Sequence, residues 1–106
     1  MRVIFADEAW EDYLYWQKQD RQMVERINRL IREIQRDPFA GVGKPEALKH
    51  ALAGFWSRRI TGEHRIVYRV EDDALLIAQL RLTRPLPAIV RKSFLKRDVG
   101  STSYIP

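Results

Sequence analysis

A single carboxylate lies among cationic side chains in the segment GKPEALKH, where Lys44, Glu46, Lys49 and His50 fall within residues 43–50. To cleave RNA through its own 2′-hydroxyl, one group must remove the hydroxyl proton and an acid must protonate the leaving oxygen. Cations must also hold the pentavalent phosphate of the transition state. This set of residue types therefore suggests RNA cleavage.

The following segment, GFWSRRITGEHRIVYRV, adds four arginines over residues 54–70. If residues 61–63 form a three-residue turn, Arg59 lies opposite Arg65, and Arg69 shares their face of a hairpin. A two-residue turn would flip the pairing and mix charged with apolar side chains, so the pattern favours the first register. Opposed cations repel each other and cost stability, which indicates that a polyanion binds this face.

A simpler interpretation of these residues stays open. Charged sheet faces are common where one side of a sheet meets water, and acidic residues from neighbouring loops could pair with the arginines. A loop lysine such as Lys49 is usually solvated, and histidines such as His50 and His64 are more often structural than catalytic.

Two helices must support this hairpin. Asp7 is the expected N-cap of the first, which runs to about residue 18, and Asp20 is the expected cap of the second, roughly 21–36. Asp37-Pro38 ends the second helix. Apolar residues recur at helical spacing in both segments, which predicts a helical hairpin with a shared apolar side. They are Trp10, Tyr13 and Leu14 in the first and Met23, Ile27, Leu30, Ile31 and Ile34 in the second.

The remaining chain has the period of strands. Residues 2–5 form a short apolar strand, and residues 38–47 hold two prolines and two glycines, which predicts a loop. Alternating strands follow from about residue 52, with turns at 61–63 and 72–73. The predicted fold is α+β in the order β-α-α-β-β-β, with the two-helix hairpin packed on a mainly antiparallel sheet.

Composition limits the class of protein. The chain has 106 residues and no cysteine, which suits one domain and excludes thiolate metal sites and disulfides. We expect no metal, no cofactor and no membrane segment, because no stretch approaches the roughly 18 apolar residues of a span. A cytoplasmic location follows as an expectation. The net charge of +5 lies mostly in residues 82–106, which hold five Lys/Arg against one Asp.

Three motifs identify a family. EAWEDYLYWQ, GKPEALKH and GFWSRRITGEHRIVY, in this order and spacing, closely resemble the YoeB (Txe) toxins, which belong to the RelE-like bacterial toxin–antitoxin modules. The resemblance runs from residue 1 to about residue 81. It implies a RelE-like fold and a ribosome-dependent mRNA interferase that cuts messenger RNA in the decoding site. It also implies a YefM-type antitoxin whose disordered C-terminal segment covers the toxin's site, with operator DNA bound only through that antitoxin.

The resemblance also implies roles for particular residues. Glu46 matches the proposed general base, and Arg65 matches the arginine that holds the scissile phosphate. Arg59 and Lys49 match supporting cations around the RNA. The family motif gives no catalytic role to the two histidines at 50 and 64.

The C-terminus departs from the family. YoeB-like toxins end in Arg-Tyr-His-Tyr, with the histidine as proposed general acid, whereas Arg81 is followed here by Leu82-Thr83-Arg84. Neither threonine nor arginine readily gives up a proton near neutral pH, so we predict impaired cleavage. We predict a toxin domain over residues 1–84 and an atypical basic extension over 85–106. The extension is either natural, with a short helix from Pro87 to about residue 97, or the product of an altered reading frame.

Two alternatives to an active enzyme stay open. The chain could be a catalytically silent module that binds the antitoxin and acts as co-repressor of its own operon. It could also be a basic RNA-binding protein, with affinity for free RNA through the extension. The sequence leaves open whether two copies form a homodimer, which codons are cut, and which antitoxin binds.

Overall fold

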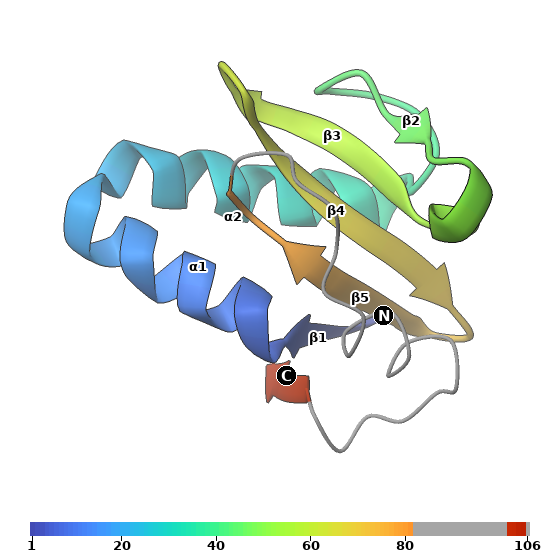
Figure 1. The fold of residues 1–106 in the computed structure, drawn as a ribbon, viewed down its shortest axis with the longest axis horizontal. Coiled ribbons are helices and arrows are strands. Elements are labelled where there is room, and N and C mark those ends of the chain that lie inside the picture. Colours follow the sequence, from blue (N-terminus) through green and yellow to red (C-terminus); the bar gives the residue numbers. More distant parts are fainter. Residues whose placement is uncertain (82–101, 106) are drawn as a thin grey trace.

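Two helices pack on a mixed sheet in the computed structural model, which describes residues 1–81 and 102–105 (Figure 1). The sheet has six strands in the order β2-β3-β4-β5-β1-β6, with β1 parallel to β5 and every other pair antiparallel. The predicted α+β architecture is confirmed, with two short strands added at β2 and β6. The elements are β1 (Arg2–Ala6), α1 (Asp7–Gln19), α2 (Arg21–Arg36), β2 (Glu46–Ala47), the 3₁₀ turn η1 (His50–Leu52), β3 (Trp56–Thr61), β4 (His64–Glu71), β5 (Ala74–Gln79) and β6 (Thr102–Ile105).

One of the two predicted helix N-caps is present in the structure. Asp20 caps α2 as predicted, because its Oδ1 accepts a hydrogen bond of 3.0 Å from the Gln22 backbone N–H. The predicted Asp7 cap is wrong: β1 runs directly into α1, so Ala6 occupies the cap position without a side-chain bond. Asp7 lies in the first turn of α1 instead, where its negative charge stabilises the helix by interacting with the positive N-terminal end of the helix dipole.

The buried face of α1 differs from the predicted one. Leu14 is exposed, and Trp10 and Tyr13 are only partly buried against the core. The buried residues are Ala9, Asp12 and Trp16. Asp12 accepts a 3.0 Å bond from the Leu80 N–H, and Trp16 Nε1 donates a 2.9 Å bond to the Leu80 carbonyl. These two bonds tie α1 to the end of β5, which explains why a carboxylate is buried there.

The hairpin of β3 and β4 has the predicted pairing but a different turn. Arg59 is paired with Arg65, as expected, yet Thr61 is paired with His64, so the turn contains only Gly62 and Glu63. A register shift between Arg59 and Thr61 absorbs the extra residue. Such a β-bulge restores the alternation that a two-residue turn alone would have flipped. The predicted three-residue turn is therefore wrong, while the predicted faces are retained.

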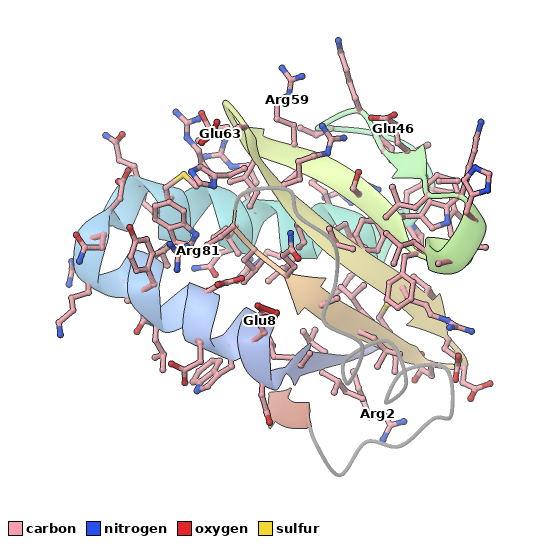
Figure 2. All side chains as sticks on the ribbon, in the orientation of Figure 1. Arg2, Glu8, Glu46, Arg59, Glu63 and Arg81 are labelled. Carbon is pink, nitrogen blue, oxygen red and sulfur yellow. The ribbon has the colours of Figure 1, made fainter. Side chains whose placement is uncertain are left out.

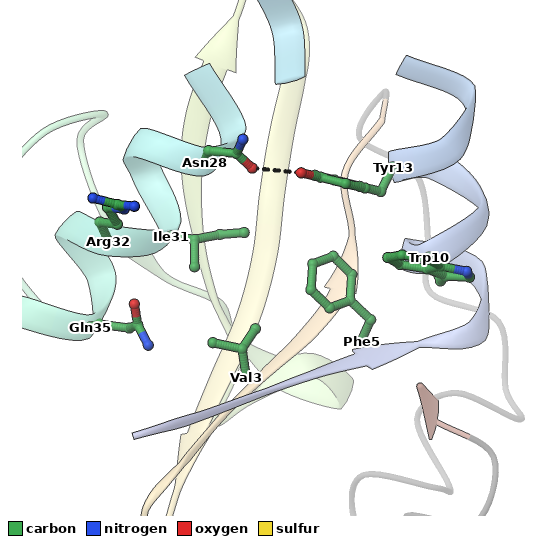
Figure 3. A pocket seen from close by; sticks show the side chains of 8 residues that line it. All are labelled: Val3, Phe5, Trp10, Tyr13, Asn28, Ile31, Arg32 and Gln35. Atoms are coloured by element: carbon green, nitrogen blue, oxygen red, sulfur yellow. Dashed lines mark hydrogen bonds between the residues drawn. The ribbon is translucent and has the colours of Figure 1, made fainter. Parts of the chain in front are cut away.

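The core lies between the helices and the central strands. The predicted apolar face of α2 is buried, except that Ile31 is only partly so, and every residue of β5 is buried. Beside this core, β1, α1 and α2 line an open cavity of about 330 Å³ (Figure 3). Its walls are mainly aromatic and aliphatic, and Tyr13 donates a 2.8 Å hydrogen bond to Asn28 across it. The lining includes no carboxylate, so this cavity offers no general base.

The structure describes only part of the chain, which bears on the predictions about a membrane segment and about the C-terminal extension. No helix among residues 1–81 and 102–105 is long and apolar enough to cross a membrane. The predicted helix from Pro87 lies outside the described residues, as do Thr83 and Arg84. The division of the chain at residue 84 stays a prediction.

Tyr68 should make stability sensitive to alkaline pH. Its side chain is fully buried, and burial raises its pKa above the ordinary 10.0, although the hydrogen bond and charge of Arg58 oppose the shift. The folded state therefore favours the neutral phenol. Its contribution to stability is complete below pH 10.0 and is lost as the pH rises through the higher folded pKa. Each pKa unit of difference corresponds to about 1.4 kcal/mol.

We expect the free energy of unfolding to fall above pH 10, and Tyr68→Phe to flatten that fall. Denaturant titrations of both proteins between pH 8 and 11 measure the two slopes. Equal slopes would show that Tyr68 ionises alike in the folded and unfolded chain.

Candidate active site

The short strand β2 places Glu46 against the hairpin. Glu46 is paired with Ser57 in β3, and its Oε1 accepts a 3.0 Å hydrogen bond from Nη2 of Arg65 in β4. The Glu46 side chain is 69% exposed, whereas that of Arg65 is 18% exposed. A solvent-facing carboxylate thus lies directly beside a recessed guanidinium, at a place that RNA can reach.

Ser57 is a member of this site that the sequence did not reveal. Its hydroxyl is buried and accepts a 3.0 Å bond from Nε of Arg65. Nothing in the residue type distinguishes Ser57, and only its register opposite Glu46 identifies it. Ser57 and Glu46 together fix the guanidinium plane. The two N–H groups of Nη1 have no acceptor within the described part of the chain, so they can bind phosphate oxygens.

The two supporting cations are placed differently. Arg59 is exposed and lies across the β3–β4 pair from Arg65. Figure 2 shows Arg59 and Glu46 projecting from the same side of the molecule. Lys49 is exposed and precedes η1, without a hydrogen bond or ion pair to the other site residues. The structure therefore brings Glu46, Arg65 and Arg59 together and leaves Lys49 at the margin of the site.

Arg69 shares the predicted face but has a local partner. Its Nη2 lies 3.0 Å from Oε2 of Glu71, and its guanidinium carbon lies 5.8 Å from the ring centre of Phe55. Four residues along a strand also separate it from Arg65 by roughly 13 Å. Arg69 thus contributes to local packing, and its charge is already neutralised.

The ion pair of Glu46 and Arg65 contributes little to stability. Pairs with a solvent-exposed partner are worth about 0–1 kcal/mol, so a phosphate can take over the arginine at low cost. The simpler interpretation of a solvated face accounts for this pair, because the acid does come from a neighbouring segment. It also accounts for the exposure of Arg59, whose side chain has no acidic partner among residues 1–81 and 102–105 and so can bind an anion.

The two histidines lie apart from this pair. The His64 ring makes an edge contact with Trp16, with ring centres 4.9 Å apart, and His50 is exposed in η1. At the end of the first described range, the Arg81 guanidinium carbon lies 3.8 Å from the ring centre of Tyr15 in α1. In that range and in β6, no three acidic or histidine side chains are grouped as in a metal site.

Comparisons with known proteins agree on one family. The family model described as the YoeB-like toxin of bacterial type II toxin–antitoxin systems matches residues 5–83. "Toxin YoeB" of Escherichia coli strain K12 is 60% identical over 81 residues, which are 76% of this chain and 96% of that protein. A solved "YoeB/ParE toxin from Agrobacterium tumefaciens" is 51% identical, with a TM-score of 0.78 over 79% of this chain and 100% of that chain. A toxin chain in a heterotetrameric YoeB–YefM complex from Staphylococcus aureus is 44% identical, with a TM-score of 0.73 over 77% of this chain and 95% of that chain.

Proposed function

Because the chain belongs to the YoeB-like toxins of bacterial type II toxin–antitoxin systems, we propose that it acts as a ribosome-dependent endoribonuclease on messenger RNA. The observation that carries this proposal is the 3.0 Å contact between the exposed Glu46 carboxylate and Arg65, whose Nη1 faces no protein acceptor in the described residues. The Glu46 carboxylate, as the base, and the Arg65 guanidinium, as the phosphate-binding group, therefore lie side by side at the surface.

The cleavage step follows from these positions. The Glu46 carboxylate takes the proton of a ribose 2′-hydroxyl, and the resulting oxygen attacks the adjacent phosphorus. Arg65 leaves Glu46 for the phosphate and stabilises the charge that develops on its oxygens. Arg59 and Lys49 hold the flanking phosphates. The 5′-oxygen departs, leaves a 2′,3′-cyclic phosphate on the preceding ribose, and needs a proton that Thr83 and Arg84 supply poorly, so turnover is slow.

We propose a YefM-like antitoxin as the protein partner, and binding of operator DNA only through that antitoxin. The staphylococcal relative is found in a YoeB–YefM heterotetramer, so a four-chain assembly is the expectation here, and homodimerisation of the free toxin stays a prediction. Acidic residues from an antitoxin segment that folds on binding would pair with Arg59 and Arg65.

Arg65→Ala should weaken binding of a YefM-like C-terminal peptide. Loss of a hydrogen bond to a charged group costs about 1.5–3 kcal/mol, which is roughly a 10- to 100-fold rise in Kd. Calorimetric titrations at several salt concentrations measure this change, and added salt should mimic it in the parent protein. Arg36→Ala is the matched control, because Arg36 is an exposed arginine at the C-terminal end of α2 whose ion pair is with Glu33 and not with a site residue. Equal affinity of the Arg65 variant at every salt concentration would exclude this face as the antitoxin site.

A second function is favoured by the ending of the chain. The Thr83-Arg84 substitution removes the acid that the family places there, which leaves a silent toxin that binds antitoxin and acts as co-repressor. Expression without antitoxin separates the two functions. Growth arrest that Glu46→Gln relieves supports the enzyme, and normal growth at matched protein levels supports the silent module.

A further inference from the structure

Arg58 is a buried cation next to the exposed Arg59. Its relative exposure is 0%, and Asp12 is the other buried charged residue in the described part of the chain. Alternation along β3 turns Arg58 towards the helices while Arg59 faces outward. Burial of a charge is costly unless hydrogen bonds satisfy it completely.

Four acceptors surround the Arg58 guanidinium. Nε donates to the Tyr68 hydroxyl at 3.1 Å, Nη1 donates to the Val42 carbonyl at 3.1 Å, and Nη2 donates to the carbonyls of Ala40, at 3.0 Å, and of Asp37. The Tyr68 hydroxyl in turn donates to the Pro38 carbonyl at 2.7 Å. Four hydrogen bonds therefore connect β3 and β4 to one segment, residues 37–42, and a fifth, from Arg58 to Tyr68, joins the two strands.

This segment has no strand or helix to hold it, and it leads directly into the site. Gly43 follows the segment directly, and its carbonyl accepts a 2.8 Å bond from the Arg59 N–H. Gly43 has a φ of +87°, and a Cβ there would lie 3.0 Å from the Arg59 carbonyl oxygen. The chain thus lies tightly against β3 three residues before Glu46.

Stability alone does not explain this arrangement. Replacement of buried ionic groups by apolar side chains of similar volume is often neutral or stabilising. A guanidinium has one property that apolar groups lack, because its five donors in a rigid fork can fix several carbonyls at once.

We infer that Arg58 is a positioning residue, which gathers the carbonyls of residues 37–42 and thereby sets the entry into β2 that holds Glu46 beside Arg65. Arg58 itself is inaccessible to RNA. Its effect on cleavage rests on the proposed function, whereas its effect on the loop does not.

The first test concerns the loop alone and uses the full chain. Arg58→Lys keeps the charge but loses the fork, and Arg58→Met removes the charge at similar length. Hydrogen exchange followed by NMR should show at least about 10-fold faster exchange for the Arg59 and Leu48 amides, which report on the Gly43 contact and on the end of β2. Amides of β5 should keep their protection. Uniform acceleration over the whole sheet, or no change at Arg59 and Leu48, would overturn the inference.

If either variant fails to fold, Tyr68→Phe serves in its place, since it removes one acceptor of Arg58 and the bond to Pro38. It should accelerate the same two amides to a smaller degree. Unchanged exchange in a folded Tyr68→Phe protein would also contradict the inference.

The second test concerns catalysis, in the full chain that carries Thr83→His and Arg84→Tyr, the residues of the family ending. A misplaced base should lower kcat by up to about 10²-fold, while KM stays unchanged because Arg58 touches no RNA. Addition of Arg58→Lys to Glu46→Gln should cause no further loss, because Arg58 acts through Glu46. An additive loss would contradict the positioning role. Full activity of Glu46→Gln would instead contradict the proposed function, and the exchange data would still decide the role of Arg58.

Discussion

A chain that carries Thr83→His and Arg84→Tyr and stops after residue 84 should cleave ribosome-bound messenger RNA about 10²–10⁴ times faster than the present chain. The leaving 5′-oxygen needs a proton in the transition state. A threonine alcohol does not ionise near neutral pH, and an arginine gives up its proton far too reluctantly. An imidazole titrates near pH 6.5 and can supply that proton. Single-turnover cleavage on programmed ribosomes measures the rate of the chemical step.

A chain that stops after residue 84 without the two substitutions is the necessary control. It lacks the extension, including β6, which pairs with β1 from Val3 to Ala6. It therefore separates the loss of that strand from the gain of an acid. Equal cleavage rates for the present and the restored chain would contradict the prediction. In that case the ribosome or water would protonate the leaving oxygen, and position 83 would carry no catalytic role.

In the restored chain, Glu46→Gln should lower the cleavage rate by about 10²–10⁴-fold. Glutamine keeps the size of the side chain, and its carbonyl can still accept the hydrogen bond from Arg65. It cannot accept the proton of a 2′-hydroxyl, because an amide is not a base near neutral pH. The same single-turnover assay measures the loss. The affinity of the toxin for the ribosome that carries the messenger RNA should stay unchanged.

Glu11→Gln is the matched control for Glu46→Gln, since Glu11 is an exposed carboxylate on α1 that makes no contact with the site. This control variant should cleave at the parent rate. A Glu46→Gln protein with parent activity would assign proton removal to another group, and Arg65 would then act on phosphate without an adjacent base.

Local sequence determined the elements of this protein. The apolar spacing of Met23, Ile27 and Leu30 predicted α2 and its buried face, because that spacing depends only on the helical period. Asp20 capped the helix as expected, since a cap is a contact between near neighbours. Alternation along β3 and β4 likewise predicted the opposed pair Arg59 and Arg65.

Contacts between distant segments determined the rest. Leu14 is exposed and Asp12 is buried because the end of β5, 68 residues away, offers Asp12 a backbone N–H. The bulge before Thr61 is visible only in the pairing of β3 with β4, and no local pattern marks it.

The candidate site likewise depends partly on local sequence and partly on contacts between distant segments. Residue types and the family resemblance singled out Glu46 and Arg65 as candidates, but the two residues are 19 positions apart. Their 3.0 Å contact depends on the pairing of β2 with β3, on the Ser57 hydroxyl and on the loop that Arg58 holds. A one-dimensional pattern cannot rank Arg58 against Arg59, because both are arginines in one strand. Only the tertiary structure decides that one is fully buried among carbonyl groups while the other faces the solvent.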